Sequence, residues 1–409
     1  MANTQSLSRR SMMLRSAACG TVMSVGANTA VLPSFLMGAP QSTTENVLVV
    51  LQLSGGNDGL NTVIPFDHPV YQKNRPSLAV GKDQVLAIEE NLGFHPVATG
   101  LSTLLEQSQL SIIQGVGYPN PNRSHFESMD IWHTCRRKDA VRDEGWIGAS
   151  VNQHLTRQDN DTPILHLGSE KQPLALTATD PRSISIRSLD QFKLQANQEQ
   201  ITSVVQTTNS DDDSNALLGF LQSSTASALK TSEQLLRSAA SKTRDNDGAA
   251  YPQHRLAQKL QTIAKLIDSP LKTRVYYVTL DGFDTHAQQA GAHESLLGQL
   301  SSALAAFVAD LKQRQQGQRV TTMVFSEFGR RLAENASKGT DHGAAGPMFL
   351  AGEGILPGLI GKHPSLTDLQ QGDLKHQFDF RQVYASVLQW MGWEDDALGK
   401  SFKPLELFT

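Results

Sequence analysis

Residues 46–59 read NVLVVLQLSGGNDG, a continuous apolar run that ends in a glycine-rich turn. Several of its residues are β-branched, and no charged side chain occurs before Asp58. Strands of a parallel sheet are covered on both faces, so they show near-continuous apolar runs instead of strict alternation. The run therefore predicts a buried parallel strand, followed by a tight turn in which glycines permit close approach of the backbone.

Four more stretches repeat this apolar pattern. They are residues 110–116, 163–168, 274–280 and 320–325. Helical patterns occur at residues 97–107, 292–314 and 380–392. A strand, a helix and a second strand joined by short links form a βαβ unit. The sequence therefore predicts an α/β fold, with a doubly wound, mostly parallel sheet flanked by helices.

Residues 190–250 differ from the rest in composition. They are rich in Gln, Ser, Thr, Asn and Asp, and three consecutive aspartates stand at 211–213. Short amphipathic helices are expected at 214–240 and 251–268. We predict one α/β domain over residues 41–409 that carries a helical insertion, with a flexible acidic loop, at about 190–270.

The first forty residues have the composition of an export signal. Arg9 and Arg10 resemble the pair of a twin-arginine signal, and a mildly apolar stretch follows over roughly residues 17–37. Gly, Ser, Thr and Asn interrupt that stretch, so no stable membrane span is expected. The pattern predicts a twin-arginine signal region at residues 1–40 and a periplasmic or secreted protein. A chance arginine pair in a disordered tail is the alternative.

The composition narrows the possible partners. The chain has 409 residues, of which 39% are hydrophobic and 19% charged, an ordinary globular composition. Residues 1–39 contain three arginines and no Lys, Asp or Glu, so the remainder holds 33 basic against 40 acidic residues. No basic stripe is left, and nucleic acid is not an expected partner. The chain has two cysteines, Cys19 and Cys135. Cys19 lies in the predicted signal region, so only Cys135 would remain after cleavage, and no intrachain disulfide is expected.

Ligands of open α/β sheets bind at the carboxyl ends of the strands, and the first predicted strand ends in a polar loop. Asp58 and Asn61 in this loop offer oxygens that could bind a metal ion or hold a phosphate-like group. An Asx turn over residues 57–59, which only shapes the loop, is the alternative. Taken alone, the loop favours that alternative.

Ser124 stands at the expected start of a helix, after the second strand, between Arg123 and His125. A helix N-terminus carries free N–H groups and partial positive charge, which suit an anion. A serine in this position can act as a nucleophile if a metal or base activates it. The alternative is a capping box formed with Glu127, which would only start the helix. The neighbouring cation and imidazole exceed what capping requires, so Arg123, Ser124 and His125 are candidate catalytic residues.

Asp281, Asp284 and His286 follow the strand predicted at 274–280. Two carboxylates and an imidazole directly after a buried strand are costly unless they are paired or bound to a metal. This loop therefore predicts a functional site.

Two further loops carry residues of the same kind. Glu327 and Arg330 follow the strand predicted at 320–325, and a surface salt bridge is their alternative explanation. Asp341 and His342 are bracketed by glycines, an arrangement that suits a divalent metal. The candidate metal ligands are thus Asp58, Asp281, Asp284, His286, Glu327, Asp341 and His342. Zinc, manganese, calcium and magnesium all remain open as the ion.

In their order, these loops resemble the family known as domain of unknown function 1501, a branch of the alkaline-phosphatase superfamily. The resemblance covers nearly the whole chain after the signal region. The segments that carry it are Gly55–Asn61, Ser124–Phe126, Asp281–His286, Ser326–Arg330 and Gly339–Gly343. The resemblance implies a doubly wound sheet flanked by helices, often preceded by a twin-arginine signal.

The superfamily also implies roles for individual residues. By that analogy Asp58 is the first metal ligand and Ser124 is the nucleophile. An Asp/His pair from residues 281–286 and then His342 would complete the ligands. The sequence departs from the superfamily in two places: the spacing of the pair in 281–286 does not match Asp-x-x-x-His, and Glu327 stands where Asp-His is usual. A complete two-metal site is therefore in doubt, and a one-metal or rearranged site remains open.

Two functions follow from the resemblance. The first is an exported metal-dependent hydrolase that acts on a small phosphate or sulfate ester. The second is a catalytically silent exported module that keeps the fold for binding or assembly with another exported protein. The fold alone does not distinguish them, because function depends on the site.

Overall fold

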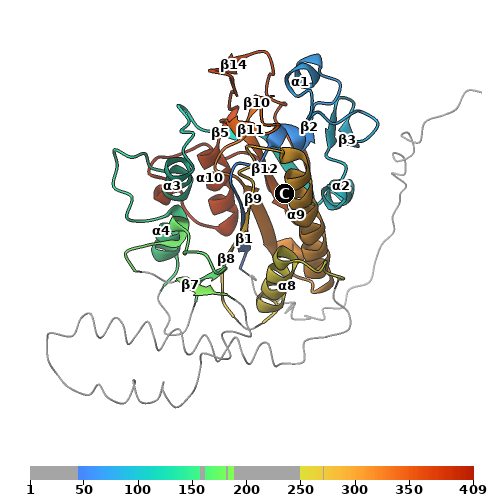
Figure 1. The fold of residues 1–409 in the computed structure, drawn as a ribbon. Helices are drawn as coiled ribbons and strands as arrows, with labels where there is room; N and C mark the ends of the chain where they lie inside the picture. The colour runs from blue at the N-terminus through green and yellow to red at the C-terminus, as the bar shows by residue number, and fades with distance from the viewer. Residues whose placement is uncertain (1–44, 157–161, 181–182, 188–248, 270) are drawn as a thin grey trace, which may run out of the picture. The chain divides into compact units, whose positions relative to one another are not determined.

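The computed structural model describes residues 45–409 except 157–161, 181–182, 188–248 and 270. Its centre is a nine-stranded sheet in the order β13-β5-β12-β9-β1-β8-β6-β7, with β16 also paired to β5. In these residues β12 pairs antiparallel with both neighbours, and the other strand pairs of this sheet are parallel. The predicted doubly wound, mostly parallel sheet is confirmed (Figure 1).

The strands of the main sheet are β1 (Val47–Ser54), β5 (Leu110–Gly117), β6 (Ile164–Leu167), β7 (Ser183–Ile186), β8 (Val275–Asp281), β9 (Val320–Phe325), β12 (Gly346–Ala351), β13 (Gly358–Ile360) and β16 (Phe378–Asp379). The described helices are α1 (Pro69–Asn74), α2 (Thr99–Glu106), α3 (His125–Thr134), α4 (Trp146–His154), α8 (Arg255–Ile267), α9 (Gln289–Gln313) and α10 (Phe380–Met391). All five strands predicted from apolar runs are present, each within two residues of its expected bounds.

β1 lies in the middle of the sheet, and both of its faces are buried. Val49 and Leu51 belong to the core on one side, and Leu48 and Val50 belong to the core on the other side. Because successive side chains of a strand point to opposite faces, a strand covered on both faces needs an unbroken apolar run. The sequence at 47–53 meets this requirement.

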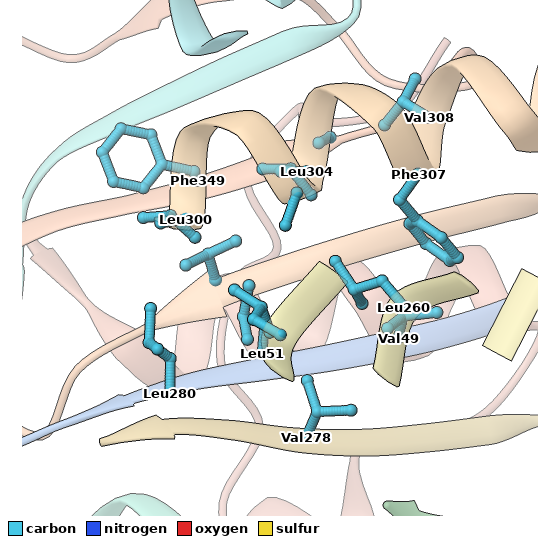
Figure 2. Packing of buried hydrophobic residues seen from close by; sticks show 14 of the residues in the cluster. Val49, Leu51, Leu260, Val278, Leu280, Leu300, Leu304, Phe307, Val308 and Phe349 are labelled. Atoms are coloured by element: carbon cyan, nitrogen blue, oxygen red, sulfur yellow. The ribbon is translucent and has the colours of Figure 1, made fainter. Parts of the chain in front are cut away.

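The two faces of the sheet are covered by different helices. α2, α8 and α9 contribute to one core and α3, α4 and α10 to the other, on opposite sides of the sheet in Figure 1. α9 buries Leu300, Leu304 and Phe307, which follow helical spacing. Figure 2 shows these side chains lying over Val49 and Leu51 of β1.

Two predicted helices bear on the expected insertion. The helix predicted at 251–268 is α8, and its residues Leu256, Leu260 and Ile263 belong to the main core. This part of the chain is therefore a constituent of the helical layer. The helix predicted at 214–240 and the signal region at 1–40 lie outside the described residues. In the part that is described, no helix is both long and apolar enough to cross a membrane.

The loops with predicted functional residues emerge at one edge of the sheet. Ser54 at the end of β1 is in register with Asp281 at the end of β8, and Gln52 is in register with Phe325 at the end of β9. β5 runs in the same direction, since both β5 and β9 are antiparallel to β12. Two small hairpins lie beyond this edge: β10 (Arg330–Glu334) with β11 (Thr340–His342), and β14 (Leu369–Gln370) with β15 (Asp373–Leu374). A three-stranded sheet of β2 (Val63–Ile64), β4 (Leu92–Phe94) and β3 (Leu86–Glu89) completes the fold.

Candidate metal centre

Three imidazoles and one carboxylate converge at this edge. The Oδ1 atom of Asp284 lies 3.0 Å from Nε2 of His286, 3.1 Å from Nε2 of His342 and 3.3 Å from Nε2 of His125. The Nε2 atoms of His286 and His342 are 2.8 Å apart. The ligand atoms that His125, Asp284 and His342 can offer all lie within 4.8 Å of one another. The loops after β5, β8 and β9 therefore meet, as the sequence predicted for an edge formed by strand ends.

Oxygen acceptors at the Nδ1 atoms fix the orientation of the His125 and His342 rings. His342 Nδ1 lies 2.6 Å from the carbonyl oxygen of Arg123, and His125 Nδ1 lies 2.8 Å from Oε1 of Glu327. Since these oxygens act as acceptors, both Nδ1 atoms carry the hydrogen. In the neutral rings the Nε2 lone pairs then face the carboxylate of Asp284. A ring nitrogen held by an oxygen acceptor, with the opposite nitrogen free, is the usual arrangement of metal-binding histidines.

The atoms that face the centre of this arrangement are electron donors. Two lone pairs and a carboxylate oxygen face one another, and Nε2 of His125 is buried without a hydrogen-bond partner. The hydrogen bond to Glu327 raises the pKa of His125, and the nearby Asp284 carboxylate also contributes to this rise. A bound metal ion would satisfy all of these atoms. Imidazole nitrogens with one carboxylate oxygen suit zinc and other first-row transition metals better than calcium or magnesium.

The sequence predicted Glu327 as a metal ligand, but its carboxylate instead holds the ring of His125, a candidate ligand. Glu327 is 1% exposed, and its Oε1 atom accepts hydrogen bonds from the Gly55 N–H at 2.8 Å and from His125. A surface salt bridge is excluded for both Glu327 and Arg330, because both are buried. Glu327 therefore joins the turn after β1 to the ring of His125.

Arg330 fixes Asp284, a role that the sequence did not reveal. Its guanidinium donates to Asp284 Oδ1 at 2.9 Å and to the carbonyls of Gly56 and Thr340, each at 2.8 Å. Burial alone would raise the pKa of Asp284, but the hydrogen bond and the charge of the Arg330 guanidinium lower it, so the carboxylate stays ionised. An ionised carboxylate that Arg330 holds in one position can bind a cation.

His286 is the most exposed of the three rings. Its Nδ1 atom lies 3.5 Å from Oδ1 of Asp341, which also accepts a hydrogen bond from Asn335 at 3.1 Å. Asp341, predicted as a ligand, thus stands behind His286. Asp281, also predicted as a ligand, ends β8 with an exposed side chain and does not belong to the converging group.

Asp58, predicted as the first ligand, is part of a different, buried network. Its Oδ2 atom pairs with Nη1 of Arg75 at 2.5 Å and accepts from Nε2 of Gln289 at 2.5 Å. Asp58 and Arg75 are 1% and 0% exposed. Burial raises the pKa of Asp58, but the Arg75 guanidinium outweighs it and lowers the pKa overall. The Asx alternative does not account for this residue either, because Asp58 anchors a buried ion pair.

We expect substitution of Asp58 to change stability and not metal content. Asp58→Ala should lower the free energy of unfolding by about 3–5 kcal/mol, because it leaves the Arg75 guanidinium buried and unpaired. Asp67→Asn, which removes the exposed partner of Lys82, should cost at most about 1 kcal/mol. Urea unfolding and zinc analysis of the folded fraction measure both quantities. A stable Asp58→Ala protein that has lost its metal would restore Asp58 as a ligand.

Ser124 occupies the predicted helix start, at the N-cap position of α3. Its side chain is exposed and makes no capping hydrogen bond. Glu127 pairs with Arg142 instead, with Oε2 3.0 Å from Nη1. The Asn122 side chain accepts the hydrogen bond of the Ser124 N–H at 2.8 Å. The alternative explanation of Ser124, a capping box formed with Glu127, is thus absent, and the Ser124 hydroxyl stays free beside His125.

Comparison with known proteins gives one family and a set of distant structures. The sequence model of a family described as "Protein of unknown function (DUF1501)" matches residues 111–406. No curated protein matches the sequence.

Three of the similar solved structures show how low the sequence identity and structural similarity are. The PsFucS1 sulfatase from Pseudoalteromonas sp. is 10% identical, covers 86% of this chain and 68% of its own, and has a TM-score of 0.38. The C-terminal periplasmic domain of EcEptC from Escherichia coli, in complex with Zn, is 11% identical, with 87% and 85% covered and a TM-score of 0.40. The alkaline phosphatase of the Antarctic bacterium TAB5 is 9% identical, with 86% and 99% covered and a TM-score of 0.37. At such low identities and TM-scores, the chemistry of the site has to be inferred from the residues of this chain alone.

Proposed function

The chain belongs to the DUF1501 family of proteins of unknown function, and we propose that it is an exported, metal-dependent hydrolase of phosphate or sulfate esters. The metal would be held by His125, His286, His342 and Asp284, with zinc as the preferred ion. One observation carries the proposal: the Nε2 lone pairs of His125 and His342 face a carboxylate oxygen, while oxygen acceptors hold both Nδ1 atoms.

The ester chemistry is inferred from the start of α3. The N–H groups in the first turn of a helix have no intrahelical acceptor and attract anions. Ser124 lies at this start with a free hydroxyl, next to the candidate ligand His125 and to Arg123, whose carbonyl orients His342. A bound metal would supply Lewis acidity and positive charge for the developing oxyanion.

Ser124 is the proposed nucleophile. Its Oγ atom would lose its proton to solvent and form a bond to the phosphorus or sulfur atom of the ester, while the bond to the alcohol oxygen breaks and the alcohol leaves with a proton. Water would then hydrolyse the seryl ester and release phosphate or sulfate. The helix N–H groups would bind the non-bridging oxygens in both steps. Ser124 is exposed, and Phe126, the second residue of α3, is 87% exposed. The hydroxyl is therefore accessible to a small ester from solvent.

The proposal is tested by metal analysis followed by turnover measurements. Protein purified without chelator should contain about one zinc per chain, as fits a single group of four ligands. It should hydrolyse at least one aryl phosphate or aryl sulfate, and the activity should disappear with chelator and return with zinc. Protein that holds zinc but hydrolyses no ester in a broad panel would instead support the silent binding or assembly module.

Export by the twin-arginine route remains a part of this proposal. It is supported by Arg9 and Arg10 and by the apolar stretch after them. Replacing both arginines with lysine should leave the precursor in the cytoplasm of a bacterial host, because the route recognises the pair and not the charge alone. Cell fractionation and immunoblotting measure the distribution. Undiminished periplasmic accumulation of the double variant would refute the assignment.

A further inference from the structure

A buried carboxylate on a neighbouring hairpin is connected to the candidate metal centre through two arginines. Asp373 is the first residue of β15 and is 2% exposed. The turn that joins β14 to β15 consists of Gln371 and Gly372, both with positive φ (56° and 84°). Such two-residue turns match the twist of a hairpin, so the hairpin presents Asp373 in a defined position.

Asp373 and the turn between β14 and β15 contact the guanidinium groups of Arg123 and Arg331. Its Oδ2 atom accepts from Nε of Arg123 at 2.8 Å and from Nη2 of the same side chain at 2.5 Å. Its Oδ1 atom lies 3.4 Å from Nε of Arg331. The carbonyl of Gln371 accepts from Arg331 at 3.2 Å and from Arg123 at 3.5 Å. One carboxylate and one carbonyl therefore fix two arginines.

Each arginine leads to a candidate ligand. The backbone carbonyl of Arg123 accepts the hydrogen bond of His342 Nδ1. Arg331 directly follows Arg330, whose guanidinium holds Asp284, and Arg330 is in register with His342 across the β10–β11 hairpin. Thus Asp373 reaches two of the four candidate ligands by short covalent and hydrogen-bonded paths.

We propose that Asp373 is a positioning residue of the metal centre: by fixing Arg123 it holds the carbonyl that sets the orientation and tautomer of His342. This inference rests on the proposed metal centre. Partners of metal-binding histidines fix the ring and its tautomer, and their loss weakens metal affinity by about 10–100-fold. Asp373 acts one step further out, so its effect falls at the low end of that range.

The first test measures zinc affinity in the full chain by competition with a chromophoric chelator. Asp373→Asn should bind zinc about 10-fold more weakly than the wild type. Arg123→Ala keeps the backbone carbonyl and should give a similar loss. The double variant should lose little more, because both changes break the same connection. Asp368→Asn is the matched control: Asp368 lies before the hairpin and pairs with the exposed Lys375, so zinc affinity should be unchanged.

The second test reads the tautomer of His342 directly. In metal-free protein at about pH 8, where imidazole is neutral, ¹⁵N NMR of histidine-labelled chain should show the Nδ1–H form at His342. Asp373→Asn should shift that ring toward a mixture of tautomers, and Asp368→Asn should not. A stability role for the hairpin alone would lower the thermal midpoint without moving this signal.

The outcomes separate the two proposals. Wild-type protein that binds no zinc refutes the metal centre, and the His342 tautomer then still decides whether Asp373 positions the ring. Wild-type zinc affinity together with an unaltered tautomer in Asp373→Asn overturns the inference while leaving the metal centre intact. If Asp373→Asn does not fold, Arg123→Ala decides by the same two measurements, since its side chain is 35% exposed.

Discussion

Asp284→Ala is expected to abolish stoichiometric zinc binding, whereas Asp281→Ala is expected to leave it unchanged. The two aspartates stand three residues apart, Asp281 at the end of β8 and Asp284 in the loop that follows. Asp284 Oδ1 is within 3.3 Å of three imidazole nitrogens, and Asp281 is exposed and outside that group. Loss of an outer partner alone costs about 10–100-fold in affinity, so loss of a ligand should exceed about 100-fold.

Chelator competition and thermal unfolding measure this pair of variants. A ligand that binds only the folded state stabilises it, so removal of zinc should lower the thermal midpoint of the wild type and of Asp281→Ala. The midpoint of Asp284→Ala should not respond to chelator. His342→Ala should behave in the same way as Asp284→Ala. Equal zinc content in Asp281→Ala and Asp284→Ala would exclude the proposed centre.

The strands were predictable because their burial leaves a direct mark on the sequence. β1 has helices on both faces, and its residues 47–53 are apolar almost without interruption. α9 is similarly marked by the spacing of Leu300, Leu304 and Phe307. The edge at which the loops meet followed from the sheet topology. Sequence therefore placed His286 and His342 together correctly, with 2.8 Å between their Nε2 atoms.

The division of roles within the site was less predictable. Asp58 and Asp284 both follow buried strands and both pair with an arginine, and the sequence does not indicate which of the two ion pairs is fully buried. The structure gives Asp58 the buried Arg75, which lies 17 residues later in an otherwise unremarkable segment. His125 was predicted as a catalytic residue, and the structure places its ring among the candidate metal ligands. Both outcomes depend on contacts between distant segments.

A partial signal for Arg330 was present. A charged residue shortly after a buried strand is costly unless it is paired, and Arg330 stands soon after β9, at the start of β10. Its five acceptors nevertheless come from three separate segments of the chain: the turn after β1, the loop after β8, and Thr340 at the start of β11. Spacing along the chain cannot reveal such a set. Asp373 and Arg123 present the same difficulty, because 250 residues separate them.

Ser124→Ala is expected to lower ester turnover by about 10³-fold or more, while metal content and stability stay near the wild-type values. The sequence left two explanations for this residue, a nucleophile or a helix cap. A lost cap would cost about 0.5–2 kcal/mol of stability. The structure shows no capping hydrogen bond from the Ser124 side chain, so a stability loss of that size is not expected.

Turnover, zinc content and thermal midpoint of the same preparation decide the question. Ser102→Ala on α2 removes a hydroxyl far along the chain from the site and serves as the matched control. Full turnover in Ser124→Ala would show that the free hydroxyl beside His125 is not the nucleophile, and that the ester is attacked by another group. Loss of turnover with zinc retained would assign the hydroxyl, because the change leaves the backbone carbonyl of Arg123 and the ring of His125 in place. A simultaneous loss of zinc would instead mean that Ser124 orders the loop that carries both of these groups.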